Sequence, residues 1–205
     1  LGGAIACDVH GKNHHKDGSF GNFVNWIEIF NNNNEVVRCS SDENSELFHW
    51  TIGGMGLTGV IIRCSIQLKR VESGWIKQQT VVNNNLNETL QSFYEHKKAT
   101  YSVAWIDCLA KGKSFGRSIL MLGEHAQESE LKTKPIIYPK RKNQKIIFPF
   151  DTPSFLLNNF TVSAFNKLYF NLNKNKQSSY VDWDTYFYPL DSIGDWNRMY
   201  GKEGF

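Results

Sequence analysis

The chain has 205 residues, of which 40% are hydrophobic and 14% aromatic, so it is long enough to bury a core in one or two domains. Its 23 basic and 20 acidic residues leave a formal net charge of +3, which is too small to attract nucleic acid or an anionic membrane in bulk. The longest apolar runs fall far short of the roughly 20 residues that a spanning helix needs, so we expect no transmembrane segment.

Residues 1–72 carry the signals of short strands, one short helix and glycine-rich turns. The β-rich residues 23–30 and 35–39 flank four asparagines at 31–34, a pattern that predicts a hairpin. The other elements expected here are a helix over 45–51, capped by residues 41–44 and ended by Gly53 and Gly54, and a strand over 60–71.

Residues 73–205 predict an antiparallel sheet with flanking helices. Leu90, Phe93 and Tyr94 have the spacing of one apolar helix face, which predicts a helix over 88–98 behind a cap region at 83–87. Prolines and charged residues at 128–144 indicate an exposed loop with local mobility. The remaining elements expected are strands over 78–82, 101–107 and 116–124, ordered segments over 166–171 and 180–188, and a turn leading into a short helix over 189–201.

The chain opens on a small-residue turn in which Gly2 and Gly3 leave the backbone open to close approach, because glycine has no Cβ. The polar and titratable residues that follow are Cys7, Asp8, His10, His14 and His15. Zinc accepts such donors, but they lie on one short loop, no second ligand pair follows, and Lys12 would place a cation beside the metal. A noncatalytic metal- or ligand-binding module therefore stands as an alternative of another class, and a purely structural remnant as a third.

Residues 54–59 read GxGxxG, the pattern of a dinucleotide-binding fingerprint. That fingerprint follows a strand and opens a helix, whereas here a short helix precedes the glycines and a strand follows them. We interpret the segment as a turn that needs positive φ. In a functional version, the glycines would let a cofactor lie against exposed backbone while Ile61 covers one of its faces.

The cysteines at positions 7, 39, 64 and 108 lack any CxxC spacing, and three of them lie in apolar or strand-like surroundings. This pattern predicts buried free thiols and a reducing compartment. The expected location is the cytoplasm or the periphery of the inner membrane.

Several segments together resemble the FAD-linked oxidases of the vanillyl-alcohol-oxidase type, a family that includes oxidases of polyprenyl-phosphate-linked ribose and sugar-lactone oxidases. The order of the segments is the same throughout, and the resemblance covers nearly the whole chain. The segments that carry it are residues 2–15, 18–22, 53–59, 102–107, 188–191 and 196–198.

The resemblance implies a flavin site in the first part of the chain. In the family, the opening glycines and the loop up to the histidine line the flavin, mainly through backbone atoms, and the second glycine-rich turn adds one further contact. His10 occupies the place where some relatives attach flavin covalently, and we expect noncovalent FAD. The residues expected to contact FAD are Gly2, Gly3, Cys7, Asp8, Val9, His10 and Ile61.

The resemblance also implies a substrate site. His10 and Lys12 are expected at the reacting centre, and the Lys12 ammonium would donate hydrogen bonds to sugar hydroxyls or a phosphate. Tyr169 stands where the family carries an aromatic wall of the pocket, a tryptophan in the related oxidase, and Arg198 is a further expected substrate contact. This departure at Tyr169 leaves the exact substrate open.

The resemblance predicts an α+β flavoprotein: residues 1–72 would complete an FAD-binding domain, and residues 73–205 would begin an antiparallel-sheet substrate-binding (cap) domain. Enzymes of this family begin with a subdomain that cradles the FAD pyrophosphate, and they continue past the position of Phe205. The chain is therefore expected to be a middle fragment that depends on the remaining segments of its parent and is inactive alone.

The expected reaction of that parent is FAD-dependent oxidation of a sugar alcohol carbon by hydride transfer to flavin N5. Carbon 2 of a polyprenyl-phosphate-linked ribose is the expected position, and a sugar-lactone or alditol oxidase is the alternative within the superfamily. The expected partners are a sugar or lipid-linked sugar and the remaining parental segments, with no nucleic acid and with proximity to a membrane surface.

Overall fold

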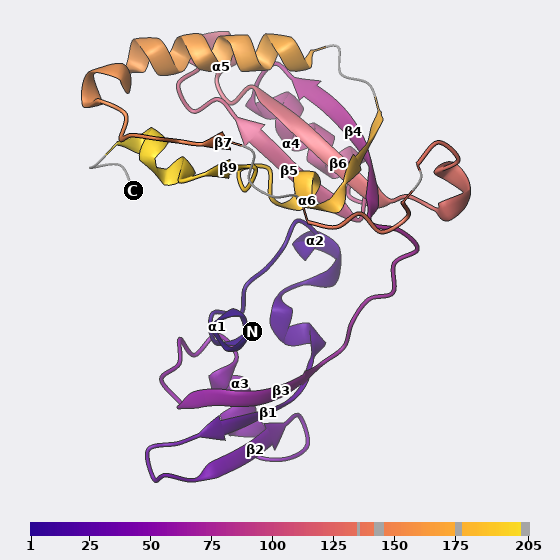
Figure 1. Ribbon diagram of the computed structural model, residues 1–205, viewed down its shortest axis with the longest axis vertical. Coiled ribbons are helices and arrows are strands. Elements are labelled where there is room, and N and C mark those ends of the chain that lie inside the picture. Colours follow the sequence, from indigo (N-terminus) through magenta and orange to yellow (C-terminus); the bar gives the residue numbers. More distant parts are fainter. Residues whose placement is uncertain (135, 142–145, 175–177, 202–205) are drawn as a thin grey trace. The chain divides into compact units, whose positions relative to one another are not determined.

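The computed structural model describes residues 1–134, 136–141, 146–174 and 178–201. The chain divides into two compact units, Leu1–Arg70 and Val71–Phe205, each of which is described by itself below (Figure 1). In the described ranges, no helix has the length and apolar character needed to cross a membrane.

Unit 1 is a three-stranded antiparallel sheet in the order β2-β1-β3 (Figure 1). The hairpin predicted around the asparagines is confirmed, and the Asn31 side chain accepts hydrogen bonds from the backbone N–H groups of Asn33 (2.9 Å) and Glu35 (3.0 Å). The elements of this unit are α1 (Gly2–Ala6), α2 (His14–Asp17), the 3-10 turn η1 (Phe20–Phe23), β1 (Val24–Phe30), β2 (Val36–Ser40), α3 (Ser45–Thr51) and β3 (Val60–Ile66).

The core of unit 1 lies between the central strand and the two helices α1 and α3. Ile27 and Ile29 of β1 and Ile5 of α1 are completely buried, and Phe48 of α3 is almost so. Each such side chain contributes about 1.5–3 kcal/mol of transfer free energy. This burial explains why the opening residues form a helix and not the turn expected from the sequence, although two glycines disfavour a helix.

Two further expectations for unit 1 need correction. Asn44 stands at the N-cap of α3 with φ +47°, but its side chain donates to the Arg38 carbonyl (2.8 Å) and does not cap the helix. The strand predicted to reach residue 71 ends at Ile66. The Gln67 N–H still donates to the Phe23 carbonyl, but β1 begins at Val24, so the residues after Gln67 have no strand to pair with.

Unit 2 is built on a four-stranded antiparallel sheet in the order β5-β6-β4-β8 (Figure 1). A short parallel pair, β7 with β9, lies outside it. The strands are β4 (Trp75–Asn83), β5 (Tyr101–Ile106), β6 (Ser118–His125), β7 (Ile146–Ile147), β8 (Ser179–Asp182) and β9 (Ile193–Gly194). The helices are α4 (Leu86–Glu95), α5 (Asn159–Asn173) and α6 (Trp183–Phe187), and the 3-10 turns are η2 (Gly112–Ser114), η3 (Glu128–Glu130), η4 (Ser154–Leu156) and η5 (Trp196–Tyr200).

Helices cover both faces of this sheet. Tyr186 of α6 packs so closely on β6 that a Cβ at Gly123 would lie 2.6 Å from its ring. Ser118 of the same strand faces α4, where its hydroxyl lies 2.8 Å from that of Thr89. Because side chains alternate along a strand, positions 118 and 123 point to opposite faces. The α+β class predicted from the sequence is therefore confirmed.

The helix predicted over 88–98 exists as α4 but spans Leu86–Glu95, and its orientation about its own axis is not the predicted one. Leu90 and Tyr94 are 60% and 67% exposed, whereas Thr89 and Ser92 are buried. Ser92 donates to the Asn83 side chain at 2.6 Å, and this amide in turn donates to Ser118 at 3.2 Å. A buried hydrogen-bond network, and not an apolar stripe, therefore joins α4 to β4 and β6.

The segment predicted as an exposed, mobile loop is anchored in its described ranges, 128–134 and 136–141. Leu131 is buried, and the indole N–H groups of Trp75 and Trp183 each donate at 2.8 Å, to the carbonyls of Ile136 and Pro139. Prolines prevented any regular periodicity here, so the sequence pattern did not indicate these contacts. Residues 135 and 142–144 of that prediction lie outside the described ranges.

Candidate functional site

The opening helix is held in place by the glycine-rich turn that follows α3. The carbonyls of Ile5 and Ala6 accept hydrogen bonds from the backbone N–H groups of Gly53 (3.1 Å) and Met55 (2.8 Å). Both donor residues have positive φ, and a Cβ at Gly54 would lie 2.0 Å from the Trp50 carbonyl oxygen. The interpretation of residues 54–59 as a turn requiring positive φ is confirmed. The turn leads into strand β3, whereas the glycines of a dinucleotide-binding fingerprint lead into a helix.

A second set of hydrogen bonds ties the end of this segment to η1. The Asp8 carboxylate accepts from the Gly21 N–H at 2.8 Å, and the Val9 carbonyl accepts from the Phe20 N–H at 2.8 Å. Asp8 has φ +40°, a conformation that aspartate adopts more readily than most residues. We call the resulting assembly the glycine cradle, made of residues 2–10, Phe20, Gly21, residues 53–55 and Ile61.

The glycine cradle presents backbone that no side chain covers. A Cβ at Gly2 would lie 3.5 Å from the Ile61 Cβ, whereas a Cβ at Gly3 would meet nothing within 4 Å. Gly3 is exposed, and Ile61 is half-buried beside the helix. A flat group can therefore approach the peptide planes at Gly3 closely, with the Ile61 side chain at its border.

His10 and Lys12 follow directly on the cradle. His10 is exposed, and its ring centroid lies 4.9 Å from that of His14. Lys12 is half-buried, and this partial burial lowers the pKa of its ammonium group. The surface beside the cradle thus offers an imidazole and an incompletely solvated cation, groups that bind hydroxyl or phosphate oxygens.

The described residues contain no group of three or more His, Cys, Asp or Glu side chains that could hold a metal ion. In the opening cluster, the Asp8 carboxylate accepts from the Gly21 N–H, and the His14 Nδ1 lies 3.2 Å from the Gly11 carbonyl.

The four cysteines are free, but the prediction of buried thiols holds only in part. Cys39 is buried and Cys64 half-buried, whereas Cys7 and Cys108 are exposed because they lie outside the strands.

In unit 2, the two predicted substrate residues have different neighbours. Tyr169 of α5 is half-buried against Trp105 of β5, with ring centroids 4.9 Å apart, and burial raises the pKa of its hydroxyl. The Arg198 guanidinium donates to the Asp151 carboxylate and to the Pro149 carbonyl, both at 3.1 Å. Tyr169 thus belongs to an aromatic pair on the sheet, and Arg198 joins η5 to the segment before η4.

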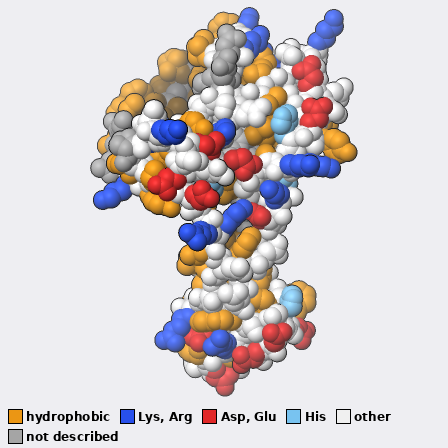
Figure 2. All heavy atoms as spheres, turned by 90° about the vertical axis from the view of Figure 1, so that its right-hand side faces the viewer, with side chains coloured by type: hydrophobic (Ala, Val, Ile, Leu, Met, Phe, Trp, Pro, Cys, Tyr) orange, Lys and Arg blue, Asp and Glu red, His pale blue; other side chains and the backbone are white. Residues whose placement is uncertain are grey.

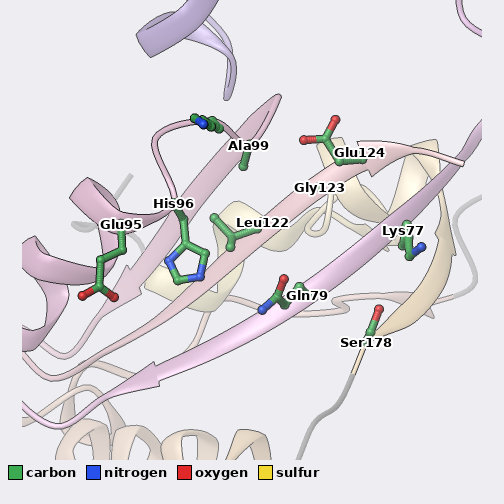
Figure 3. A pocket seen from close by; sticks show the side chains of 10 residues that line it. Lys77, Gln79, Glu95, His96, Ala99, Leu122, Gly123, Glu124 and Ser178 are labelled. Atoms are coloured by element: carbon green, nitrogen blue, oxygen red, sulfur yellow. The ribbon is translucent and has the colours of Figure 1, made fainter.

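Unit 2 also contains an open cavity of about 400 Å³ beside the end of α4 (Figure 3). His96 and Leu122 point toward it in Figure 3, and Gln79 lies opposite them on β4. The His96 Nδ1 lies 2.8 Å from the Ser92 carbonyl, so this ring nitrogen donates to that carbonyl. None of the residues predicted for the site lines this cavity, so it carries no part of the predicted chemistry.

The supports of the cradle were not singled out individually from the sequence. Gly21 and Gly53 donate to residues 13 and 48 positions away, and such distances in sequence leave no local periodicity. The same holds for Trp105, which lies 64 positions from Tyr169 in the chain. The local sequence signal for these supporting residues is that they are glycines, which occur where the backbone has no room for a side chain or needs positive φ.

No protein-family model matches the chain. Curated relatives do match it, and cytokinin dehydrogenases are among them: a stretch of 46 residues is 46% identical to cytokinin dehydrogenase 9 of Oryza sativa, covering 22% of this chain and 9% of that enzyme. The chain is thus similar to a class of oxidases and dehydrogenases.

Within that class, one relative matches the chain from end to end. Decaprenylphosphoryl-β-D-ribose oxidase of Mycolicibacterium smegmatis is 35% identical over 210 aligned residues, which cover 100% of this chain and 46% of that enzyme. An uncharacterized protein of Streptomyces coelicolor is 28% identical over 162 residues, covering 78% of this chain and 44% of that protein. The chain spans about half the length of these two relatives, and the resemblance inferred from segments along nearly the whole chain is confirmed.

Proposed function

We propose that this chain is part of an FAD-dependent oxidoreductase that oxidises a sugar alcohol carbon, with carbon 2 of a polyprenyl-phosphate-linked ribose as the position attacked. The observation that carries the proposal is the 35% identity to decaprenylphosphoryl-β-D-ribose oxidase over the whole chain. In this proposal, unit 1 contributes to the flavin site and unit 2 to the substrate site.

The glycine cradle fits a flavin. Its peptide planes at Gly3 are open, Ile61 borders them, and the backbone bonds from Gly53 and Met55 hold the surface rigid. Gly2, Gly3, Cys7, Asp8, Val9, His10 and Ile61 are the residues that would hold it. When bound, FAD supplies the acceptor for the hydride that leaves the alcohol carbon.

The chain's own polar groups would bind and orient the sugar. The partly buried Lys12 ammonium donates hydrogen bonds to a hydroxyl or phosphate oxygen, with less competition from water than an exposed lysine has. The exposed His10 imidazole, two residues before Lys12 in the chain, offers ring nitrogens for hydrogen bonds to the sugar. These two side chains are the catalytic residues of the proposal.

Unit 2 would supply the remaining substrate contacts. The aromatic pair of Tyr169 and Trp105 offers an apolar surface against which a sugar ring can pack. Arg198 uses its Nε and Nη1 groups on Asp151 and Pro149, and its guanidinium has further N–H donors for a phosphate oxygen.

The test uses the protein isolated from the cells that make it. We expect a yellow protein with flavin absorption bands, whose colour is released by acid precipitation because the FAD is noncovalent. Gly3→Ala places a methyl group on the open surface and is expected to weaken FAD binding about tenfold or more. Ile62→Ala changes the exposed neighbour of Ile61 on β3 and is the matched control, with unchanged FAD binding. A colourless protein that does not take up added FAD would refute the proposal.

A further inference from the structure

Helix α5 packs on the sheet of unit 2 with two buried amides on its inner side. Asn166 is 9% exposed and Asn173 is 5% exposed. The Asn166 amide donates at 2.7 Å to the carboxylate of Asp107, the residue that directly follows β5. The Asn173 amide donates at 2.8 Å to the Tyr169 carbonyl of its own helix. Of the two amides, that of Asn166 is therefore the one that ties α5 to the sheet.

The carboxylate that accepts this hydrogen bond is itself held in place. Asp107 is 2% exposed, and its other oxygen accepts from the Arg117 guanidinium at 2.6 and 2.9 Å. The central carbon of the same guanidinium lies 4.8 Å from the centroid of the Phe170 ring. Phe170 follows Asn166 by four positions, so both lie on one side of α5. An ion pair of the β5–β6 hairpin thus contacts two successive turns of the helix.

The aromatic pair of the proposed substrate surface lies next to these contacts. Trp105 is the last residue but one of β5, and Tyr169 follows Asn166 by three positions on the helix. The Trp105 and Tyr169 ring centroids are 4.9 Å apart, with an angle of 59° between the ring planes. Aromatic pairs accept a range of distances and tilts, whereas a hydrogen bond to a carboxylate is directional. The Asn166–Asp107 bond therefore defines the position of α5 more sharply than the ring contact does.

The outer side of α5 indicates that apolar burial does not decide the rotation of the helix about its axis. Phe165, Leu168 and Leu172 lie on this side and are 60%, 58% and 66% exposed. Apolar side chains, drawn in orange, lie at the top of this unit in Figure 2, where Figure 1 places α5. Burial of apolar area alone would favour turning such side chains toward the sheet. A polar contact is therefore needed to account for the observed rotation.

We propose that Asn166 is a positioning residue of the substrate site: its bond to Asp107 selects the rotation of α5 that places Tyr169 against Trp105. Selecting one register or orientation among competing packings is the best-attested role of buried polar groups. The inference rests on the proposed function, which assigns the aromatic pair to the sugar. Asn166 is buried against the sheet and acts on the sugar through Tyr169.

The first measurement needs no substrate. Near-ultraviolet circular dichroism records the asymmetric packing of aromatic rings, and the difference between the original protein and Tyr169→Leu defines the signal of the aromatic pair. Asn166→Leu removes the amide donor at similar volume and is expected to lose most of this signal. The matched control is Asn173→Leu, which removes an equally buried amide that bonds within α5, and it is expected to keep the signal. Thermal melts verify each fold, and Asn166→Ala replaces Asn166→Leu if the leucine variant does not fold.

The second measurement is steady-state kinetics of the FAD-loaded enzyme, isolated from the cells that make it, with a polyprenyl-phosphate-linked ribose. Asn166→Leu is expected to raise KM about tenfold and to change kcat less than about twofold, because a displaced Tyr169 ring weakens sugar binding. Asn173→Leu is expected to leave both constants unchanged. In a Tyr169→Leu background, Asn166→Leu is expected to have no further effect on KM, which separates positioning through Tyr169 from a general loss of stability.

Failure of this inference and failure of the proposed function are distinguishable. An enzyme that holds no flavin or does not oxidise the ribose refutes the proposed function, and the circular dichroism still decides whether Asn166 positions the pair. The inference is overturned if Asn166→Leu keeps the signal of the pair, or if an active Asn166→Leu enzyme has an unchanged KM. It is also overturned if Tyr169→Leu leaves KM unchanged, or if the effects of the two replacements on KM multiply, since Asn166 would then not act through Tyr169.

Discussion

Asp107 and Arg117 form a buried ion pair in which Oδ2 of the carboxylate accepts from Nη2 at 2.6 Å and from Nε at 2.9 Å. The second oxygen accepts from the Asn166 amide at 2.7 Å and from the Leu109 N–H at 3.1 Å. Both oxygens of a carboxylate that is only 2% exposed are thus satisfied. One side chain therefore joins the β5–β6 hairpin to helix α5.

The stability of unit 2 is expected to fall in acid because of Asp107. Burial alone would raise the pKa of this carboxyl, but the hydrogen bonds from Arg117, Asn166 and Leu109 outweigh burial and lower it. A lowered folded-state pKa means that the charged form contributes stability above the unfolded-state pKa of about 3.9. That contribution is lost as pH falls through the folded-state pKa.

Urea unfolding between about pH 2 and pH 6 measures this effect, and Asp107→Asn is expected to flatten the acid limb of the curve. Asp107→Ala leaves the Arg117 guanidinium without its partner and is expected to cost about 3 kcal/mol at neutral pH. An unchanged pH dependence in the Asn variant would show that other carboxylates cause the acid limb.

The cysteines are expected to differ in reactivity. Burial raises the pKa of the Cys39 thiol, and the nearby Glu43 carboxylate adds to this effect, so the reactive thiolate is scarce there. Cys7 and Cys108 are exposed. Alkylation of the native protein followed by peptide mass spectrometry is expected to label Cys7 and Cys108 first, and Cys39 only after denaturation. Rapid labelling of Cys39 in the native protein would contradict the fold of unit 1.

Replacement of two glycines in unit 1 by alanine is expected to have different effects on the free energy of unfolding. Gly59 has φ +137°, and a Cβ there would lie 2.5 Å from the Phe30 carbonyl oxygen, so Gly59→Ala is expected to destabilise by about 2 kcal/mol or more. Gly3 is helical with open space around it, so Gly3→Ala is expected to leave stability unchanged or raise it by up to about 1 kcal/mol. Chemical denaturation of both variants measures the difference, and equal effects would contradict the geometry of the β3 entry.

Asp8 is expected to stabilise unit 1 mainly through the carboxylate oxygen that accepts a hydrogen bond from the Gly21 N–H. Asp8→Ala removes the acceptor of the Gly21 N–H and places alanine at φ +40°, so a loss of about 1–2 kcal/mol is expected. Asp8→Asn keeps an oxygen acceptor and a side chain that tolerates this backbone conformation, so it serves as the control with a smaller loss. Thermal unfolding compares the two, and an Asn variant as unstable as the Ala variant would show that the negative charge, not the acceptor, is required.

The strands and helices of this chain follow largely from local sequence patterns. The asparagine turn defines the first hairpin, and short runs of strand-forming residues define β5 and β6, because both signals lie within a few consecutive residues. The orientation of α4 does not follow in the same way, since it depends on hydrogen bonds among Asn83, Ser92 and Ser118, which are separated in sequence.

The candidate site divides in a similar manner. The resemblance to a family predicts Gly2 and Ile61 in one site, and the structure brings them together although 59 positions separate them. The bonds that support the cradle connect three loops, and loops carry no periodic signal. The aromatic pair formed by Tyr169 with Trp105 likewise depends on tertiary packing of α5 on β5.

The polar network beneath α4 has a practical consequence for anyone preparing this protein. Because hydrogen bonds to Asn83 and Ser118 select the rotation of the helix, Leu90 and Tyr94 face water without contributing to the choice. Leu90 and Tyr94 can therefore be replaced with lysine or glutamate to improve solubility, and the helix is expected to keep its orientation on the sheet.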